Sequence, residues 1–208
     1  MNILAIETSL PQASLCLYTE GKIVYTAEWS AERNHDAHLF PALEEALSTL
    51  GQSALDYILV GSGPGSYGGV RVALAAAIGI STVRGGKLVS LCSWQGLAPQ
   101  DCGIISDARR GGWTLYRPGQ EICVLPPAQL QEEIAKGLRI CTIESEECLQ
   151  KAGLSAEKYN LVPTASGLVE AWLALPQTER EQLEQKPAEP IYVRPPHITE
   201  AKRKPWEV

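Results

Sequence analysis

Long hydrophobic runs and a basic leader are both missing from this chain of 208 residues. No stretch of about 18 consecutive apolar residues occurs, which is the length a membrane-spanning helix needs. The first residues begin a strand pattern at once, without a basic segment or a cleavage site. We therefore expect a protein that is neither exported nor inserted into a membrane, and a cytoplasmic location.

Histidine is scarce, because the chain has only His35, His38 and His197. His35 and His38 could share one face of a helix, but a metal centre needs further ligands and none stands nearby. None of the three has an evident nucleophile as a partner, so hydrolase chemistry lacks support. The sequence predicts no catalytic residue, no bound cofactor and no metal site, with His38 packed at a surface.

Positive charge is also limited, since the formal net charge is −6. Gripping a nucleic acid backbone requires concentrated Lys and Arg. Arg194 and the cluster Lys202, Arg203 and Lys204 are the candidates, and we interpret them as a solvated tail. This chain alone is not expected to hold nucleic acid.

Cysteine is present, but no two cysteines have the C-x-x-C spacing. Several of them stand inside apolar, strand-like runs, which is typical of small buried side chains. We therefore predict reduced core residues in a reducing compartment. The six are Cys16, Cys92, Cys102, Cys123, Cys141 and Cys148.

Alternating and helical patterns of apolar residues predict the same order of elements twice: three strands, a helix, a strand and a helix. In the first half the expected elements are 2–8, 13–18, 22–29, 36–50, 57–60 and 66–83, followed by a strand at 87–92. In the second half they are 102–107, 113–117, 121–125, 128–137, 139–143 and 146–152, followed by a helix at 165–175. This repeat predicts an α/β fold of two similar lobes, as in actin-like ATPases.

The glycine-rich segment Gly61–Arg71 satisfies G-x-G-x-x-G and stands between a strand and a helix, as a dinucleotide loop would. The acid that should follow about 20 residues later is missing, and so is the lysine of a Walker A loop. Pro64 occupies a glycine position of a nucleophile elbow. We interpret the segment as a tight turn that lets the next helix begin close to its strand.

A stand-alone ATPase or small-molecule kinase is the alternative function. Glu7 and Asp107 stand where the two lobes of such an enzyme carry acids for magnesium and phosphate. Around Glu7 there is no glycine for a close approach of phosphate and no second donor. Asp107 is more simply part of a charged hairpin turn.

Five segments together resemble the successive signatures of the TsaB family, in order and over almost the whole chain. They are Met1–Ser9, Arg33–Pro41, Gly63–Arg71, Asp107–Arg110 and Pro190–Arg194. The resemblance implies two actin-like, ribonuclease H-like lobes, each a mixed sheet with helices, at residues 1–100 and 101–208, the second truncated. It also implies a non-catalytic subunit that supports the catalytic paralogue TsaD in transferring a threonylcarbamoyl group to N6 of the adenosine next to the tRNA anticodon.

Partners follow from the same resemblance: a TsaD-like paralogue in a heterodimer, with a homodimer and a TsaE-like ATPase accessory as further candidates, and tRNA only through the complex. The family meets its partner through the two helices of the first lobe. The candidate interface residues are His38, Leu39, Leu43, Gly65, Ser66, Tyr67, Arg71, Ala75, Ala76 and Gly79.

The helix at 66–83 is apolar or small on every side, which an ordinary surface helix is not. Ala75 and Ala77 are separated by roughly 200° around the helix axis. We therefore expect one of them to face the core and the other to face a partner, without the sequence saying which.

Overall fold

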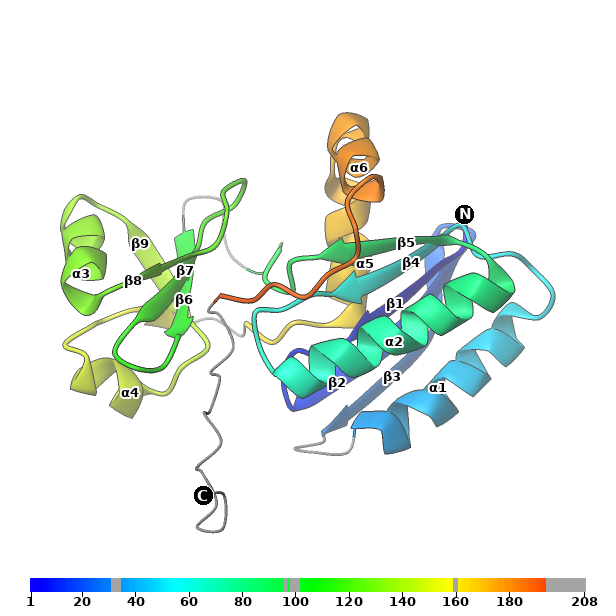
Figure 1. The fold of residues 1–208 in the computed structure, drawn as a ribbon, viewed down its shortest axis with the longest axis horizontal. Helices are drawn as coiled ribbons and strands as arrows, with labels where there is room; N and C mark the ends of the chain where they lie inside the picture. Colours follow the sequence, from blue (N-terminus) through cyan, green and yellow to red (C-terminus); the bar gives the residue numbers. More distant parts are fainter. Residues whose placement is uncertain (31–34, 96, 98–101, 159–160, 194–208) are drawn as a thin grey trace, which may run out of the picture.

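The computed structural model describes residues 1–30, 35–95, 97, 102–158 and 161–193. It is a mixed α/β structure with two five-stranded sheets, and helices cover both faces of the first sheet (Figure 1). The second sheet lies beside the first, toward the left of Figure 1.

The first sheet has the strand order β3-β2-β1-β4-β5. Its strands are β1 (Ile3–Glu7), β2 (Gln12–Thr19), β3 (Lys22–Ser30), β4 (Tyr57–Gly61) and β5 (Lys87–Leu91). β1 pairs antiparallel with β2 and parallel with β4, and all five of its residues are buried. The predicted hairpin turn between β2 and β3 is confirmed, because Glu20 and Gly21 have φ of 51° and 87°, as a type I′ turn requires.

Helices α1 (His35–Leu50) and α2 (Tyr67–Arg84) lie side by side on one face of this sheet (Figure 1). Helix α5 (Ala165–Ala174) covers the opposite face, where Leu168, Val169 and Trp172 pack against buried residues of β1 and β4. Helix α6 (Gln177–Glu184) follows and contacts β5. Two helices from late in the chain therefore complete the core of the first sheet.

The second sheet has the order β10-β9-β6-β7-β8. Its strands are β6 (Cys102–Asp107), β7 (Trp113–Tyr116), β8 (Cys123–Leu125), β9 (Arg139–Thr142) and β10 (Glu157–Lys158), and its helices are α3 (Pro127–Ala135) and α4 (Glu146–Lys151). The repeated order of elements is thus confirmed. The sequence missed β10 and α6, which carry too few apolar residues for a clear period.

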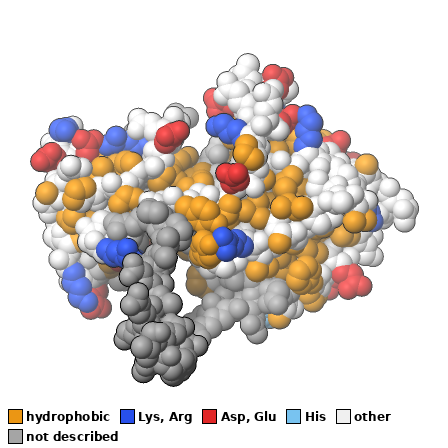
Figure 2. All heavy atoms as spheres, viewed as in Figure 1, with side chains coloured by type: hydrophobic (Ala, Val, Ile, Leu, Met, Phe, Trp, Pro, Cys, Tyr) orange, Lys and Arg blue, Asp and Glu red, His pale blue; other side chains and the backbone are white. Residues whose placement is uncertain are grey.

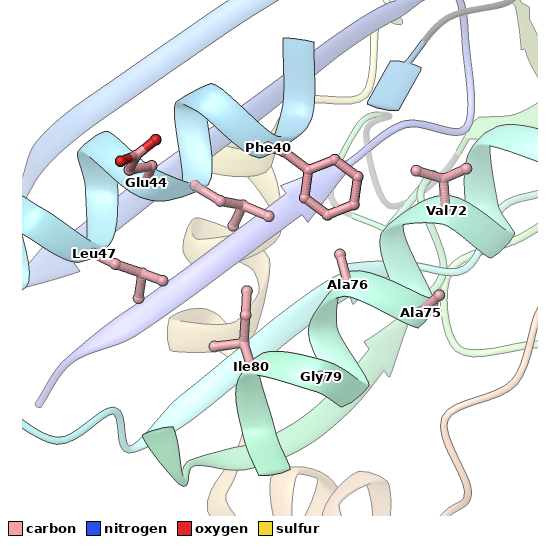
Figure 3. Close-up of a pocket in the computed structure, with 9 residues that line it drawn as sticks. Phe40, Glu44, Leu47, Val72, Ala75, Ala76, Gly79 and Ile80 are labelled. Carbon is pink, nitrogen blue, oxygen red and sulfur yellow. The ribbon is translucent and has the colours of Figure 1, made fainter. Parts of the chain in front are cut away.

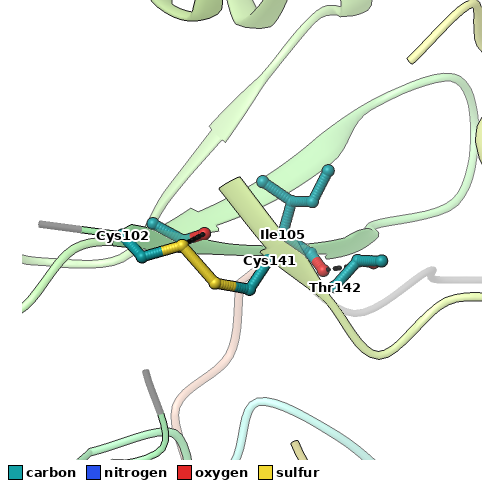
Figure 4. Close-up of a disulfide and its surroundings, with 5 residues drawn as sticks. Cys102, Ile105, Cys141 and Thr142 are labelled. Atoms are coloured by element: carbon teal, nitrogen blue, oxygen red, sulfur yellow. Dashed lines mark hydrogen bonds between the residues drawn. A yellow bond between two sulfur atoms is a disulfide. The ribbon is translucent and has the colours of Figure 1, made fainter. Parts of the chain in front are cut away.

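The prediction of six reduced core cysteines is wrong in two respects. A disulfide joins Cys102 and Cys141, with the two Cα atoms 6.5 Å apart (Figure 4). Ile104 of β6 lies opposite Cys141 of β9, and alternation puts Cys102 on the same face as Ile104, so the two thiols meet diagonally. In addition, Cys123 is exposed and Cys148 is half-buried. Only Cys16 is a free and fully buried thiol among the described residues.

Candidate functional site

An apolar groove runs between α1 and α2, on the side of these helices that faces away from the sheet (Figure 3). Its volume is about 720 Å³. The lining residues are Phe40, Leu43, Glu44, Leu47, Val72, Ala75, Ala76, Gly79 and Ile80. In Figure 3 the Phe40 ring projects from α1 toward α2, and Figure 2 shows hydrophobic side chains gathered on the face where α2 lies. Glu44 is the only charged residue of the lining.

The two faces of α2 explain why the whole helix is apolar. Ala73 and Ala77 are completely buried against the sheet. Ala75 and Gly79 are exposed on the other face, and Ala76 is half-buried in the groove. Small residues at these positions leave the backbone of α2 open to close approach by another helix.

The structure gathers four of the ten predicted interface residues into this groove: Leu43, Ala75, Ala76 and Gly79. His38 is exposed outside the lining, and its ring stacks with Trp29 at a centroid distance of 6.5 Å. Leu39 requires a correction: it has 0% exposure and belongs to the core beneath α1, so it offers no surface to a partner.

The remaining four predicted residues, Gly65, Ser66, Tyr67 and Arg71, are exposed at the start of α2. The Arg71 guanidinium lies 3.8 Å from the centre of the Tyr67 ring and donates a hydrogen bond of 3.2 Å from Nε to the hydroxyl of Tyr192. Tyr67 and Tyr192 are 5.4 Å apart between ring centroids. A segment from beyond α6 thus contributes an aromatic residue to this end of α2.

Sequence reasoning missed Phe40, which is 55% exposed and is a large apolar residue of the groove. Leu47, Val72 and Ile80 were missed as well. A signal was present, because Phe40 and Leu47 are seven residues apart and form a second apolar row beside the core row of α1.

In the glycine-rich loop between β4 and α2, three backbone N–H groups donate hydrogen bonds to neighbouring segments of the protein. Ser62 N–H donates to Leu91 O, Gly63 N–H to Ser93 Oγ and Ser66 N–H to Ser9 O. Gly65 approaches Ser9 so closely that an added Cβ would lie 2.1 Å from the Ser9 carbonyl oxygen. A phosphate-binding loop needs several free N–H groups directed at one point. The N–H groups of Ser62, Gly63 and Ser66 are already bonded to protein acceptors, so the loop acts as a packing turn at this site.

The two candidate acids of a nucleotide site differ in environment. Glu7, at the end of β1, is fully buried, and burial raises the pKa of its carboxyl group. Asp107, at the end of β6, is exposed and accepts a hydrogen bond of 2.6 Å from Arg109 N–H. Arg109, Arg110 and Gly111 all have positive φ, which identifies the predicted hairpin turn. Burial disfavours the ionised form of Glu7, and hard cations bind ionised oxygens, so Glu7 is poorly suited to hold magnesium.

Metal ligands do not converge in the part of the chain that the structure describes, where no three His, Cys, Asp or Glu side chains form a group that could hold an ion. The side chain of His35, together with Arg194, His197 and the basic cluster 202–204, lies outside the described residues. Within the described residues, no helix combines the length and hydrophobicity that crossing a bilayer requires.

Residues 29–117 match the family model described as "TsaD: tRNA N6-adenosine threonylcarbamoyltransferase". The tRNA threonylcarbamoyladenosine biosynthesis protein TsaB of Haemophilus influenzae is 35% identical over 83 residues, which cover 39% of this chain and 35% of that protein. The TsaB of Escherichia coli is 34% identical over 83 residues, covering 39% and 36%. The matched stretches thus span little more than a third of these relatives.

Two further comparisons extend over almost the whole chain. An uncharacterised protein of Mycobacterium tuberculosis is 26% identical over 205 residues, 93% of this chain and 92% of that protein. The solved structure of YeaZ from Pseudomonas aeruginosa superposes with a TM-score of 0.70 at 23% identity, covering 92% of this chain and 99% of that one. The overall fold is therefore shared over 92% of this chain.

Proposed function

Because this chain belongs to the TsaB family, we propose that it is the non-catalytic subunit that supports a TsaD-type enzyme in modifying tRNA. The reaction is transfer of a threonylcarbamoyl group to N6 of the adenosine next to the anticodon. In this proposal the first lobe, within residues 1–100, carries the partner surface. The second lobe is the second sheet with α3 and α4, while α5 and α6 return to the first sheet.

The α1–α2 groove is the observation that carries the proposal. An exposed Phe40 beside the small residues Ala75 and Gly79 forms a continuous apolar surface. Exposed apolar patches of this kind mark sites where another macromolecule binds. A partner with two helices of its own would fill the groove with large side chains and approach α2 closely.

The alternative, a stand-alone ATPase or small-molecule kinase, finds little support in the geometry. Three N–H groups of the glycine-rich loop donate to protein acceptors rather than facing a ligand, and Glu7 is buried beneath that loop. Calorimetry with Mg-ATP separates the two functions. Binding at micromolar concentration that weakens in the Asp107→Ala variant would favour the ATPase.

A heterodimer with the TsaD-like paralogue is the proposed working state. A homodimer through the same groove would be its competitor, and a TsaE-like ATPase would join the heterodimer. tRNA would be held only through the complex, since the net charge of this chain is −6. The proposal locates the protein in the cytoplasm.

The test is reconstitution of the modification with purified TsaD-type partner, accessory ATPase and tRNA. We expect the modified nucleoside, measured by mass spectrometry, only when this chain and its partner are both present. Phe40→Glu should abolish association in size-exclusion chromatography and lower product at least tenfold, because a charge would be buried in an apolar contact.

Val83→Glu is the matched control, because Val83 is 81% exposed on α2 and does not line the groove. This variant should associate and support modification normally. Full activity of Phe40→Glu, or equal loss in both variants, would contradict the proposed surface.

A further inference from the structure

The carboxyl group of Glu7 is buried in the first lobe without a counter-charge. Glu7 has 0% exposure, and its Oε1 accepts a hydrogen bond of 2.7 Å from Ser9 N–H. Its Oε2 has no hydrogen-bond partner of good geometry among the described residues. An ionised carboxylate in such a place would be strongly destabilising.

Protonation is the way a buried acid avoids this cost. Burial raises the pKa of Glu7, and this effect outweighs the hydrogen bonds from Ser9, Ser93 and Thr8, which lower it. The titratable group that faces Glu7 is the thiol of Cys92, whose own pKa is raised by burial to about 12. The Cys92 thiol supplies no positive charge, so burial favours the neutral form of the Glu7 carboxyl group.

Contacts lead from Glu7 directly to the start of α2. The Ser9 whose N–H binds Glu7 also accepts a hydrogen bond of 2.6 Å from Ser66 N–H through its carbonyl oxygen. Ser66 is the N-cap of α2. Beside it, Thr8 Oγ1 donates a hydrogen bond of 2.8 Å to Gly69 O in the first turn of α2.

The glycine-rich loop packs on the other side of the same carboxyl group. An added Cβ at Gly61 would lie 1.8 Å from Glu7 Oε2, so only glycine fits between the strand and the acid. Ser93, next to this carboxyl group, accepts the Gly63 N–H at 3.0 Å. Glu7 therefore stands between the two segments that define where α2 begins.

We propose that neutral Glu7 is a positioning residue that holds the Thr8–Ser9 turn against the start of α2, and that its ionisation releases this contact. A carboxylate would have to reach water, which requires moving the turn or the loop that covers it. The position of α2, and with it the α1–α2 groove, is then linked to a proton. An effect of Glu7 protonation on partner binding rests on the proposed function, whereas the link between Glu7 protonation and the position of α2 does not.

The first test compares the pH dependence of unfolding in urea for the natural protein and Glu7→Gln, from pH 5 to pH 10. The pKa of Glu7 is raised above its ordinary value of 4.5, so its stabilising effect is complete below 4.5 and is lost as pH rises toward the folded-state pKa. Across this window the unfolding constant of the natural protein should increase, relative to that of Glu7→Gln, by up to about tenfold per pH unit.

Exposed Glu121 provides the matched control, since Glu121→Gln makes the same chemical change at the surface. Its profile should parallel that of the natural protein. Parallel profiles for the natural protein and Glu7→Gln would overturn the proposal.

The second test needs no variant, which guards against a Glu7→Gln protein that fails to fold. Hydrogen exchange of the Ser66 amide, corrected for its intrinsic rate, should lose protection as pH rises. The amide of Gly85 donates to Ser81 O at the other end of α2 and should stay protected. Equal behaviour of the two amides would contradict the link. Failure of TsaD association with both pH effects intact would sink the proposed function and leave this inference standing.

Discussion

At the scale of single residues, the close contact between Gly65 and Ser9 decides how α2 starts. Gly65→Ala would place a methyl group 2.1 Å from the Ser9 carbonyl oxygen, so the loop must shift and the hydrogen bond from Ser66 N–H weakens. We expect a loss of about 1–3 kcal/mol in the free energy of unfolding, measured by urea denaturation.

Gly68 offers the matched comparison three residues away. A Cβ at Gly68 meets nothing within 4 Å, and alanine is the better helix former by about 1 kcal/mol. Gly68→Ala should therefore leave stability unchanged or raise it. If both variants have the same free energy of unfolding, the close contact with the Ser9 carbonyl group is not what requires glycine at position 65.

At the scale of elements, the burial of its residues shows which face of α2 packs on the core and which is open to a partner. Ala77 has 0% exposure and packs in the core, whereas Ala75 is exposed on the groove side. Ala77→Glu should unfold the protein, because it buries an unpaired charge. Ala75→Glu should give a native circular dichroism spectrum and a monomer that no longer binds the TsaD-type partner. A partner-binding Ala75→Glu protein would remove α2 from the interface.

Helix α6 depends on a polar anchor. Glu184 is 11% exposed and pairs with Lys87 of β5, and it accepts a hydrogen bond of 2.8 Å from the hydroxyl of Tyr57. The hydrogen bond from Lys87 is the main cause that lowers the pKa of Glu184. At pH 7, Glu184→Gln should cost about 1 kcal/mol of stability.

The direction of the pH effect for Glu184 is opposite to that for Glu7. A lowered pKa means that the stabilising effect is present above the ordinary value of 4.5 and is lost as pH falls through the folded-state pKa. The stability difference between the natural protein and Glu184→Gln should therefore shrink on acidification. A difference that stays constant down to pH 3 would show that packing, not charge, anchors α6.

At the scale of the whole molecule, the second sheet carries a covalent cross-link between two of its strands. The bond between Cys102 and Cys141 closes a loop with a sequence separation of 39. By the chain-entropy argument such a loop contributes about 3–4 kcal/mol. A reducing agent should lower the stability of the oxidised protein by up to this amount, measured by urea denaturation.

Two variants sharpen this measurement. Cys102→Ala combined with Cys141→Ala should be insensitive to the reducing agent, whereas Cys123→Ser, which alters an exposed free thiol, should respond as the natural protein does. An oxidised natural protein indifferent to reduction would contradict the cross-link.

The sequence alone determined the elements whose patterns are local: the hairpin at Glu20 and Gly21, the strand, loop and helix around the glycines, and the repeated order that predicts two lobes. Period and turn chemistry act between near neighbours, so they can be read without a fold. The tertiary structure decided the exposure of Ala75, the burial of Leu39, the pairing of Cys102 with Cys141 and the return of α5 to the first sheet. Those features depend on register and packing between residues far apart in the chain, which no local pattern contains. The same reason applies to Glu7, whose polar character suggested a ligand site until the glycine loop and Ser9 were seen to enclose it.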